Sequence, residues 1–211
     1  MVCVPTDRGK NIFNIMKNFH INHHFFTIIP SSPIQAFVSN LKKQVRSIIG
    51  HEFQSEFSKA HLSLFQYNEN HTDDFLYDVD WLLSALLPLD IYVNGLGIFK
   101  HGTNKTIYLQ IEYKTPIADL AEALGGKSIT PHITIARNLP ADDFDKAWEH
   151  LQSISYRNHF RCNNVTVLKR EHNKWNRYLE LPLSQGGIDE SEIPSPRSVS
   201  PQTETLKFQL R

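Results

Sequence analysis

Cysteine is scarce in this chain, since Cys3 and Cys162 are the two that occur among 211 residues. Two thiols are too few for a disulfide framework or for a zinc site with four thiolate ligands. The sequence also has no run of about 18 apolar residues, the length that a membrane-spanning helix needs. Asp7 and Arg8 interrupt the N-terminus before an apolar signal segment can form, so we expect no secretory signal and a location in the cytoplasm.

The chain also has no excess of positive or negative charge. The chain has 22 Lys and Arg residues against 22 Asp and Glu residues, for a formal net charge of +0. A protein that grips a long tract of nucleic acid must neutralise many phosphates and is usually basic. We therefore expect no long duplex as a partner, although a local pocket can still hold a few phosphates. With 40% hydrophobic and 21% charged residues, the composition is globular and excludes bulk disorder, collagen and coiled coil.

Hydrophobic spacing predicts a chain in which strands and helices alternate. Short apolar or alternating runs predict strands at 25–29, 61–65, 90–93, 106–113, 131–135, 165–168 and 178–181. Apolar residues three and four apart predict helices from Ser32 to Gly50 and at 73–87, 115–124 and 141–155. Ser32 and Gln35 have the spacing of a capping box for the first helix. Gly95, Gly97 and Gly102 lie between the strands expected at 90–93 and 106–113.

The two ends of the chain differ in composition from its middle. We expect an irregular arm over residues 1–24, a folded domain over 25–183 and a disordered tail over 184–211. Gly, Ser, Pro, Glu and Thr dominate the tail, and they cannot bury enough apolar surface to offset the entropy of ordering. His20, His23 and His24 could bind a metal, but we expect a solvated arm, no metal and no cofactor.

A weak internal repeat divides the domain. The strand at 25–29, a helix and the strand at 61–65 form one unit; the strand at 106–113, a helix and the strand at 131–135 form another. Each unit ends in a strand that carries a histidine near its start and a hydroxyl residue two positions later. Duplicated halves often build a site on the axis between them.

These two histidines and two hydroxyls form a candidate site. Because residues i and i+2 of a strand share a face, His61 shares one with Ser63, and His132 shares one with Thr134. In a common cleft, one neutral imidazole can accept a proton from an attacking oxygen while the other, as imidazolium, protonates a departing alkoxide. The hydroxyls can donate hydrogen bonds to phosphate oxygens. The set suits phosphodiester chemistry without a metal, although one such motif alone arises often by chance.

The paired motifs His61-Leu62-Ser63-Leu64 and His132-Ile133-Thr134-Ile135 resemble those of the two-histidine (2H) phosphoesterase superfamily. That superfamily includes bacterial 2′-5′ RNA ligase-like proteins, cyclic nucleotide phosphodiesterases and 2′,5′-oligoadenylate phosphodiesterases. The resemblance implies a bilobal α+β fold, in which duplicated strand–helix–strand units and antiparallel-rich sheets surround a central cleft. It also implies that His61 and His132 are the catalytic acid and base, in an order left open, and that Ser63 and Thr134 hold the phosphate.

The resemblance implies a metal-independent phosphoesterase or RNA ligase-like enzyme. Its substrate would be a cyclic phosphate or a 2′-5′ phosphodiester of a nucleotide or RNA terminus. Two other hypotheses stay open. The same cleft could bind a nucleotide or RNA end without turnover, or the tail could make this an interaction protein.

Two further residues are candidates for substrate binding. Arg137 follows Thr134 by three residues, and its planar guanidinium suits a phosphate; the alternative is a solvated surface side chain. Phe65 is predicted to share the face of His61 and Ser63, where it could stack on a base. The alternative for Phe65 is that it closes the core at a strand end.

Overall fold

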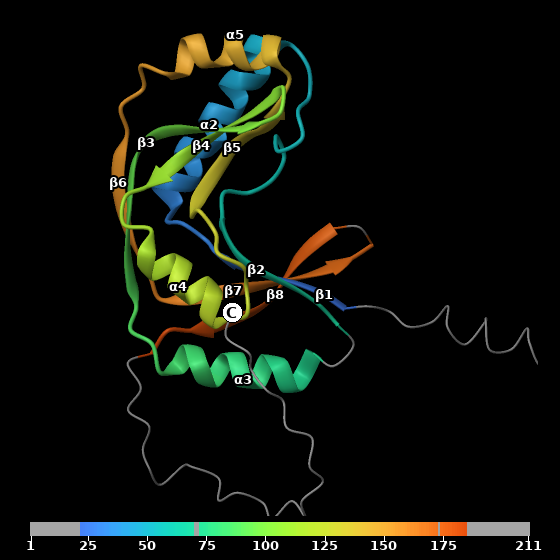
Figure 1. The fold of residues 1–211 in the computed structure, drawn as a ribbon, viewed down its shortest axis with the longest axis vertical. Helices are drawn as coiled ribbons and strands as arrows, with labels where there is room; N and C mark the ends of the chain where they lie inside the picture. Colours follow the sequence, from blue (N-terminus) through green and yellow to red (C-terminus); the bar gives the residue numbers. More distant parts are fainter. Residues whose placement is uncertain (1–21, 70–71, 173, 185–211) are drawn as a thin grey trace, which may run out of the picture.

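The computed structural model describes residues 22–69, 72–172 and 174–184, which form a sheet and four helices (Figure 1). The strands are β1 (Asn22–Ile28), β2 (Leu62–Glu69), β3 (Leu89–His101), β4 (Asn104–Ile111), β5 (His132–Leu139), β6 (Arg157–Cys162), β7 (Asn164–Glu171) and β8 (Lys174–Pro182). The helices are α2 (Ser32–Ile49), α3 (Thr72–Ser84), α4 (Thr115–Ala123) and α5 (Ala141–Leu151). The expected α+β class is therefore confirmed.

The strands form one eight-stranded sheet in the order β6-β3-β4-β5-β2-β1-β7-β8. Every pairing in it is antiparallel. The two predicted units, β1–α2–β2 and β4–α4–β5, are both present, and their last strands meet at the centre of the sheet. At that junction the register has a single partner pair, Leu62 with Ile133. The halves of the sheet are thus continuous but narrowly joined.

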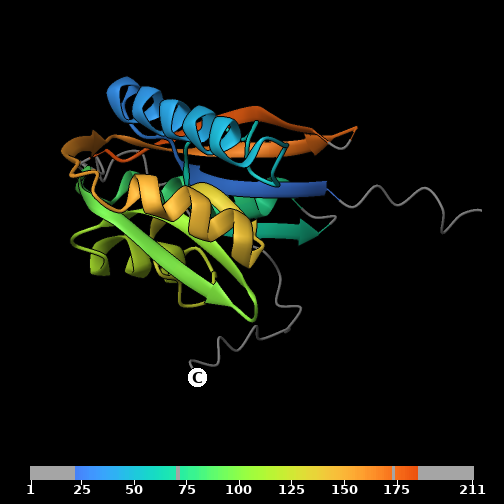
Figure 2. The same cartoon turned by 90° about the horizontal axis from the view of Figure 1, so that it is seen from above.

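The helices of the two units are exchanged between the halves. Helix α2 belongs to the first unit but packs on β5 of the second, while α4 belongs to the second unit and packs on β2 of the first. Helix α5 lies beside α2 and packs on β4, as seen in both views (Figures 1 and 2). Helix α3 packs on β8 at the opposite end of the molecule (Figure 1). Among the described residues, none of the helices combines the length and the apolar composition that a membrane span requires.

Burial alternates along the two central strands, as the sequence pattern predicts. Leu62 and Ile133 are completely buried, whereas the residues on either side of each are partly exposed. Burying such an aliphatic side chain stabilises the fold by about 1.5–3 kcal/mol. One face of the central strands therefore belongs to the core, and the other remains open to solvent.

Helix α2 is flanked by two small residues, Ser31 and Gly50, and its N-terminus lacks the predicted capping box of Ser32 and Gln35. The N-cap is Ser31, and no side chain caps the helix. Gln35 donates from Nε2 to the carbonyl oxygen of Pro30 instead, at 2.7 Å. At the other end, Gly50 adopts a left-handed conformation with φ 81°, which a glycine tolerates at no steric cost.

Several strand and helix boundaries predicted from the sequence were wrong, because pairing with a neighbouring strand lengthens some strands and creates another. Strand β1 begins at Asn22, so residues 22–24 belong to the sheet and not to the arm. Strand β3 continues through Gly95 and Gly97: its first part pairs with β6 and its second with β4, with a register shift between Val93 and Leu96. Strand β6 was not predicted, and helix α3 ends at Ser84. The rest of the arm and the tail beyond Ser184 lie outside the described residues.

Candidate active site

The four residues of the paired motifs lie where β2 and β5 meet. Leu62 pairs with Ile133, and both side chains are buried on the core face. His61 and Ser63 flank the first, and His132 and Thr134 flank the second, so all four are directed to the opposite face. Each of the four is partly exposed.

The antiparallel register relates these residues further. Continued by one residue on each side of the Leu62–Ile133 pair, it sets His61 opposite Thr134 and Ser63 opposite His132. Directly opposed side chains have Cβ atoms about 4.5–5.5 Å apart, and diagonal neighbours are about 7–8 Å apart. The two histidines are such a diagonal pair. The junction thus brings two imidazoles and two hydroxyls together although 71 residues separate the histidines along the chain.

The imidazoles are oriented by equivalent hydrogen bonds. Nδ1 of His61 lies 2.8 Å from the carbonyl oxygen of Lys59, and Nδ1 of His132 lies 2.7 Å from that of Thr130. A carbonyl can only accept, so each neutral ring carries its proton on Nδ1. Nε2 of each ring is then left with a lone pair that can take a proton, or with a proton to give once the ring is charged.

Aromatic rings border both histidines. Phe25 contacts the His61 ring edge to face, with centroids 5.6 Å apart, and Phe99 contacts the His132 ring in the same way at 4.8 Å. Tyr108 also contacts His132, at 5.3 Å. Burial lowers the pKa of both imidazoles below the usual value, and the carbonyl hydrogen bonds oppose this only in part. The positive charge of His132 further lowers the pKa of His61.

Arg137 lies close enough to act electrostatically on both histidines. Its charge lowers the pKa of His61, of His132 and of the Lys42 amine, though burial is the larger cause in each case. The Arg137 backbone N–H donates to Ser55 Oγ at 2.9 Å, and Ser55 Oγ donates to the carbonyl oxygen of Ile135 at 3.0 Å. Ser55 therefore ties the segment before β2 to β5.

Lys42 holds the same segment from the other side. Its buried Nζ donates to the carbonyl oxygen of Ser55 at 2.5 Å and to that of Ser58 at 2.7 Å. It also contacts Ser58 Oγ at 2.8 Å. Burial lowers the pKa of the Lys42 amine to about 8. This network was not predicted, but the sequence contains a signal for it, since Lys42 lies on the apolar face of α2 between Val38 and Val45.

Two cavities open on the face of the histidines. The His132 cavity has a volume of about 550 Å³, and its lining includes Ser63, Phe99, Thr106, His132 and Arg137. The His61 cavity has a volume of about 430 Å³, and its lining includes Phe25, Lys59, His61, Thr166, Trp175 and Arg177. Thr134 lines neither cavity, and its register partner on β4 is Tyr108. Each histidine therefore faces a cavity of its own beside the central junction.

Phe65 is the predicted site residue that lies elsewhere. The pairing of β1 with β2 shifts between Phe26 and Thr27, so that Ser63 opposes Thr27 while Phe65 opposes Phe26. This extra residue in β2 is a β-bulge, which changes the face of the residues beyond it. Phe65 packs on the buried Phe26 ring, with centroids 5.9 Å apart. The prediction that it shares the face of Ser63 is wrong, and Phe65 is not part of the site proposed below.

The two described histidines of the predicted arm, His23 and His24, have different neighbours. His23 Nδ1 lies 2.8 Å from Asn68 Oδ1, and His24 is buried with its ring 5.4 Å from that of Tyr178. His20 lies outside the described residues. Within the described ranges, no group of three or more His, Cys, Asp or Glu side chains is arranged to hold a metal ion.

Comparison with known proteins identifies the family. A profile described as the 2′-5′ RNA ligase superfamily matches residues 30–174. No curated protein sequence matches significantly. The fold is similar to that of TT0787 of Thermus thermophilus, with a TM-score of 0.58 and 17% identity over 78% of this chain and 99% of that one.

A second similar fold is that of E. coli LigT. The structure solved with 3′-AMP has a TM-score of 0.52 and 14% identity, over 79% of this chain and 100% of that one. The structure solved with NADP+ also has a TM-score of 0.52 and 14% identity, over 78% and 99%. Since the profile matches well over half of its residues, this chain belongs to the 2′-5′ RNA ligase superfamily, within the two-histidine phosphoesterases.

Proposed function

We propose that this protein is a phosphoesterase that opens a cyclic phosphate or cleaves a 2′-5′ phosphodiester at a nucleotide or RNA end. His61 and His132 act as general acid and base. The observation that supports this most directly is the Leu62–Ile133 pair, which joins the strands that follow the two histidines, together with the equivalent Nδ1 hydrogen bonds of the two imidazoles. In the proposed complex the phosphate bridges the junction between the two cavities, so that it contacts Nε2 of both rings.

The reaction follows from these positions. The neutral imidazole takes a proton from water at Nε2, and the water oxygen forms a bond to phosphorus. The bond from phosphorus to the leaving oxygen breaks, and the imidazolium gives that oxygen its proton from Nε2. Ser63 and Thr134 donate to the non-bridging oxygens, where negative charge builds. The lowered pKa values favour the neutral form of both rings near neutral pH, so the base is ready to accept a proton, and the acid must take up its proton against this shift. The order of the two roles stays open.

A nucleotide is the substrate class that the surroundings favour. Aromatic rings beside each histidine offer apolar surface for a base or a ribose. The similar E. coli LigT has been solved with 3′-AMP, NADP+ and ATP. With the hydroxyl of a second strand end in place of water, the same base and acid would give the RNA ligase direction. The base takes the hydroxyl proton, the hydroxyl oxygen forms a bond to phosphorus, the ring P–O bond breaks, and the acid protonates the ring oxygen that leaves.

Turnover of 2′,3′-cyclic nucleotides and 2′-5′ dinucleotides in excess EDTA tests the proposal. The unmodified protein should release the monoester or the separated nucleotides. His61→Ala and His132→Ala should each lower kcat/KM by about 10²–10⁴-fold. His150→Ala is the matched control, because His150 is exposed on α5. Turnover that persists in His132→Ala, or that EDTA abolishes, would contradict the proposal.

The same experiment separates catalysis from simple binding. Nucleotide affinity without any product, retained in the double variant His61→Ala/His132→Ala, would make the cleft a binding module. If the protein is an enzyme as proposed, product formation must instead depend on the imidazoles of both His61 and His132.

A further inference from the structure

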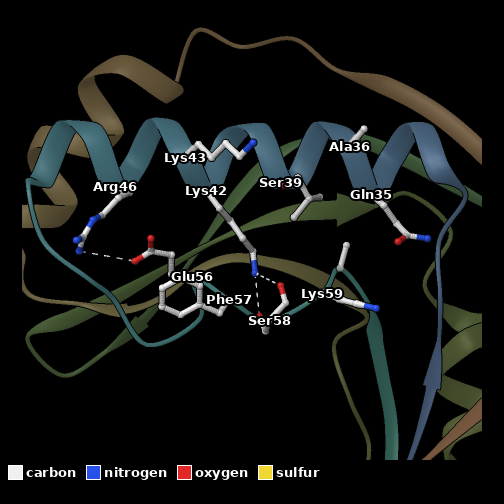
Figure 3. A pocket seen from close by; sticks show the side chains of 12 residues that line it. Gln35, Ala36, Ser39, Lys42, Lys43, Arg46, Glu56, Phe57, Ser58 and Lys59 are labelled. Carbon is white, nitrogen blue, oxygen red and sulfur yellow. Dashed lines mark hydrogen bonds and ion pairs between the residues drawn. The ribbon is translucent and has the colours of Figure 1, made fainter. Parts of the chain in front are cut away.

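A third cavity, of about 630 Å³, lies between α2 and the segment that leads into β2 (Figure 3). We name it the α2 groove. Its lining from α2 is Gln35, Ala36, Val38, Ser39, Lys42, Lys43 and Arg46, and residues 56–60 line the other side. The α2 residues lie three and four positions apart, so they form one stripe along the helix. From Gln35 to Arg46 this stripe is about 16 Å long.

The groove is positively charged although the chain as a whole is neutral. Lys42, Lys43, Arg46 and Lys59 line it, against the single carboxylate of Glu56. Lys42 is committed to the Ser55 and Ser58 carbonyls, and Arg46 lies 3.8 Å from Glu56 (Figure 3). Lys43 and Lys59 remain as exposed ammonium groups at the surface of the groove.

An aromatic side chain lies among these charges. Phe57 is 79% exposed, which is unusual for a phenylalanine and costs hydrophobic stabilisation. It lines the α2 groove and the His61 cavity alike, as do Gln35, Ser58 and Lys59. The two hollows therefore adjoin at these residues, and the groove lies beside the cavity of His61, whose Nδ1 donates to the Lys59 carbonyl oxygen.

From the residues that the two cavities share and the positive charge of the lining, we infer that the α2 groove binds the phosphate backbone of a single-stranded oligonucleotide whose end is processed at the histidines. A positively charged groove with an exposed ring is how proteins hold single strands, through phosphate contacts and base stacking. Lys43 and Lys59 would contact phosphates, and Phe57 would stack on a base. The inference rests on the proposed function and narrows its substrate from a free nucleotide to a strand end.

The test compares two substrates that share the reacting group. One is a 2′,3′-cyclic mononucleotide, and the other is a short oligonucleotide that ends in the same cyclic nucleotide. The variants are Lys43→Gln and Ser39→Glu, both at exposed positions of the α2 stripe, and the matched control is Lys114→Gln, which is exposed before α4. The measured quantity is the ratio of kcat/KM for the oligonucleotide to that for the mononucleotide.

The inference predicts that both groove variants lower this ratio, by about two- to fivefold for an exposed charge, while Lys114→Gln leaves it unchanged. Lys43→Gln should also reduce the slope of log affinity against log salt for the oligonucleotide by about 0.7. An unchanged kcat/KM ratio and salt slope in both variants would overturn the inference. So would an equal loss of kcat/KM on the two substrates. Competition by polyglutamate as strong as that by the oligonucleotide would also overturn it.

Failure of the proposed function gives a different result. If no cyclic substrate turns over, the enzyme proposal fails, and anisotropy of a labelled oligonucleotide still tests the groove. Weaker binding in both groove variants, relative to Lys114→Gln, supports the groove; equal binding in all three overturns it.

Discussion

Gly97 of β3 lies directly beneath the ring of Tyr108 of β4. A β-carbon added to Gly97 would come 2.5 Å from Tyr108 Cζ and 2.7 Å from its hydroxyl oxygen. The two residues are register partners, so the ring crosses the backbone of the neighbouring strand. The same ring stacks on Phe99 at 4.1 Å and contacts His132 at 5.3 Å. The glycine therefore sets the position of a ring that borders the candidate site.

Gly97→Ala should displace Tyr108 and disturb His132. We expect a loss of about 1–3 kcal/mol in the free energy of unfolding, as for other overpacked sites, together with a lower kcat/KM. Denaturant unfolding and turnover of a cyclic nucleotide measure the two effects. In the background of Tyr108→Ala the stability cost of Gly97→Ala should shrink; a cost of the same size there would show that the ring is not the cause.

Lys42→Met should release the segment that Ser55 ties to β5. The change leaves the buried carbonyl of Ser55 and the partly buried carbonyl of Ser58 without their donor, which costs about 1–3 kcal/mol. It should also lower kcat/KM, because Ser55 contacts Ile135 and Arg137 beside the site. Urea unfolding measures the first effect. Lys43→Met, one residue along and exposed, is the control for stability, and an equal loss in its free energy of unfolding would contradict the role given to Lys42.

Arg137→Met should move the pH profile of kcat/KM to higher pH. The Arg137 charge lowers the pKa of His61 and of His132, so its removal raises both values and shifts both limbs upward. The variant should also raise KM if the guanidinium binds the phosphate. Arg161 lies on the edge strand β6 and pairs with Asp90. Arg161→Met should therefore leave the pH profile unchanged. A profile unmoved by Arg137→Met would remove Arg137 from the site.

Acid should destabilise the fold through the two histidines. Burial lowers their folded-state pKa below the usual 6.5, so the unfolded chain binds more protons between the two values. The two histidines should therefore contribute most to the free energy of unfolding above pH 6.5. That contribution should fall as the pH drops from 6.5 through their folded-state pKa values. Denaturant unfolding at a series of pH values measures this slope. In His61→Asn/His132→Asn the slope should be shallower, and an equal slope would refute the assignment.

Much of the candidate site follows from local pattern alone. Alternation around Leu62 and Ile133 predicted which side chains share a face, because a strand has a period of two wherever it is regular. The same rule failed at Phe65, where a bulge opposite Phe26 interrupts the alternation. Nothing in the residues near Phe65 encodes that bulge, since it depends on how β1 pairs with β2.

The elements that the sequence did not predict depend on distant partners. Strand β6 forms by pairing with β3, which lies some sixty to seventy positions earlier in the chain. Strand β3 runs through two glycines, which weaken a strand locally, because β4 pairs with its second part. The charged stripe of α2 is visible in the sequence, but its use depends on residues 56–60 lying across from it.

The exchange of helices between the two units has a consequence for how the molecule must fold. Helix α2 covers a strand of the second unit, and α4 covers a strand of the first, so neither repeat can bury its own apolar surface when cut away from the other. Two separately expressed fragments, one for each unit, should therefore stay unfolded alone and should fold, and recover the proposed activity, only when they are mixed.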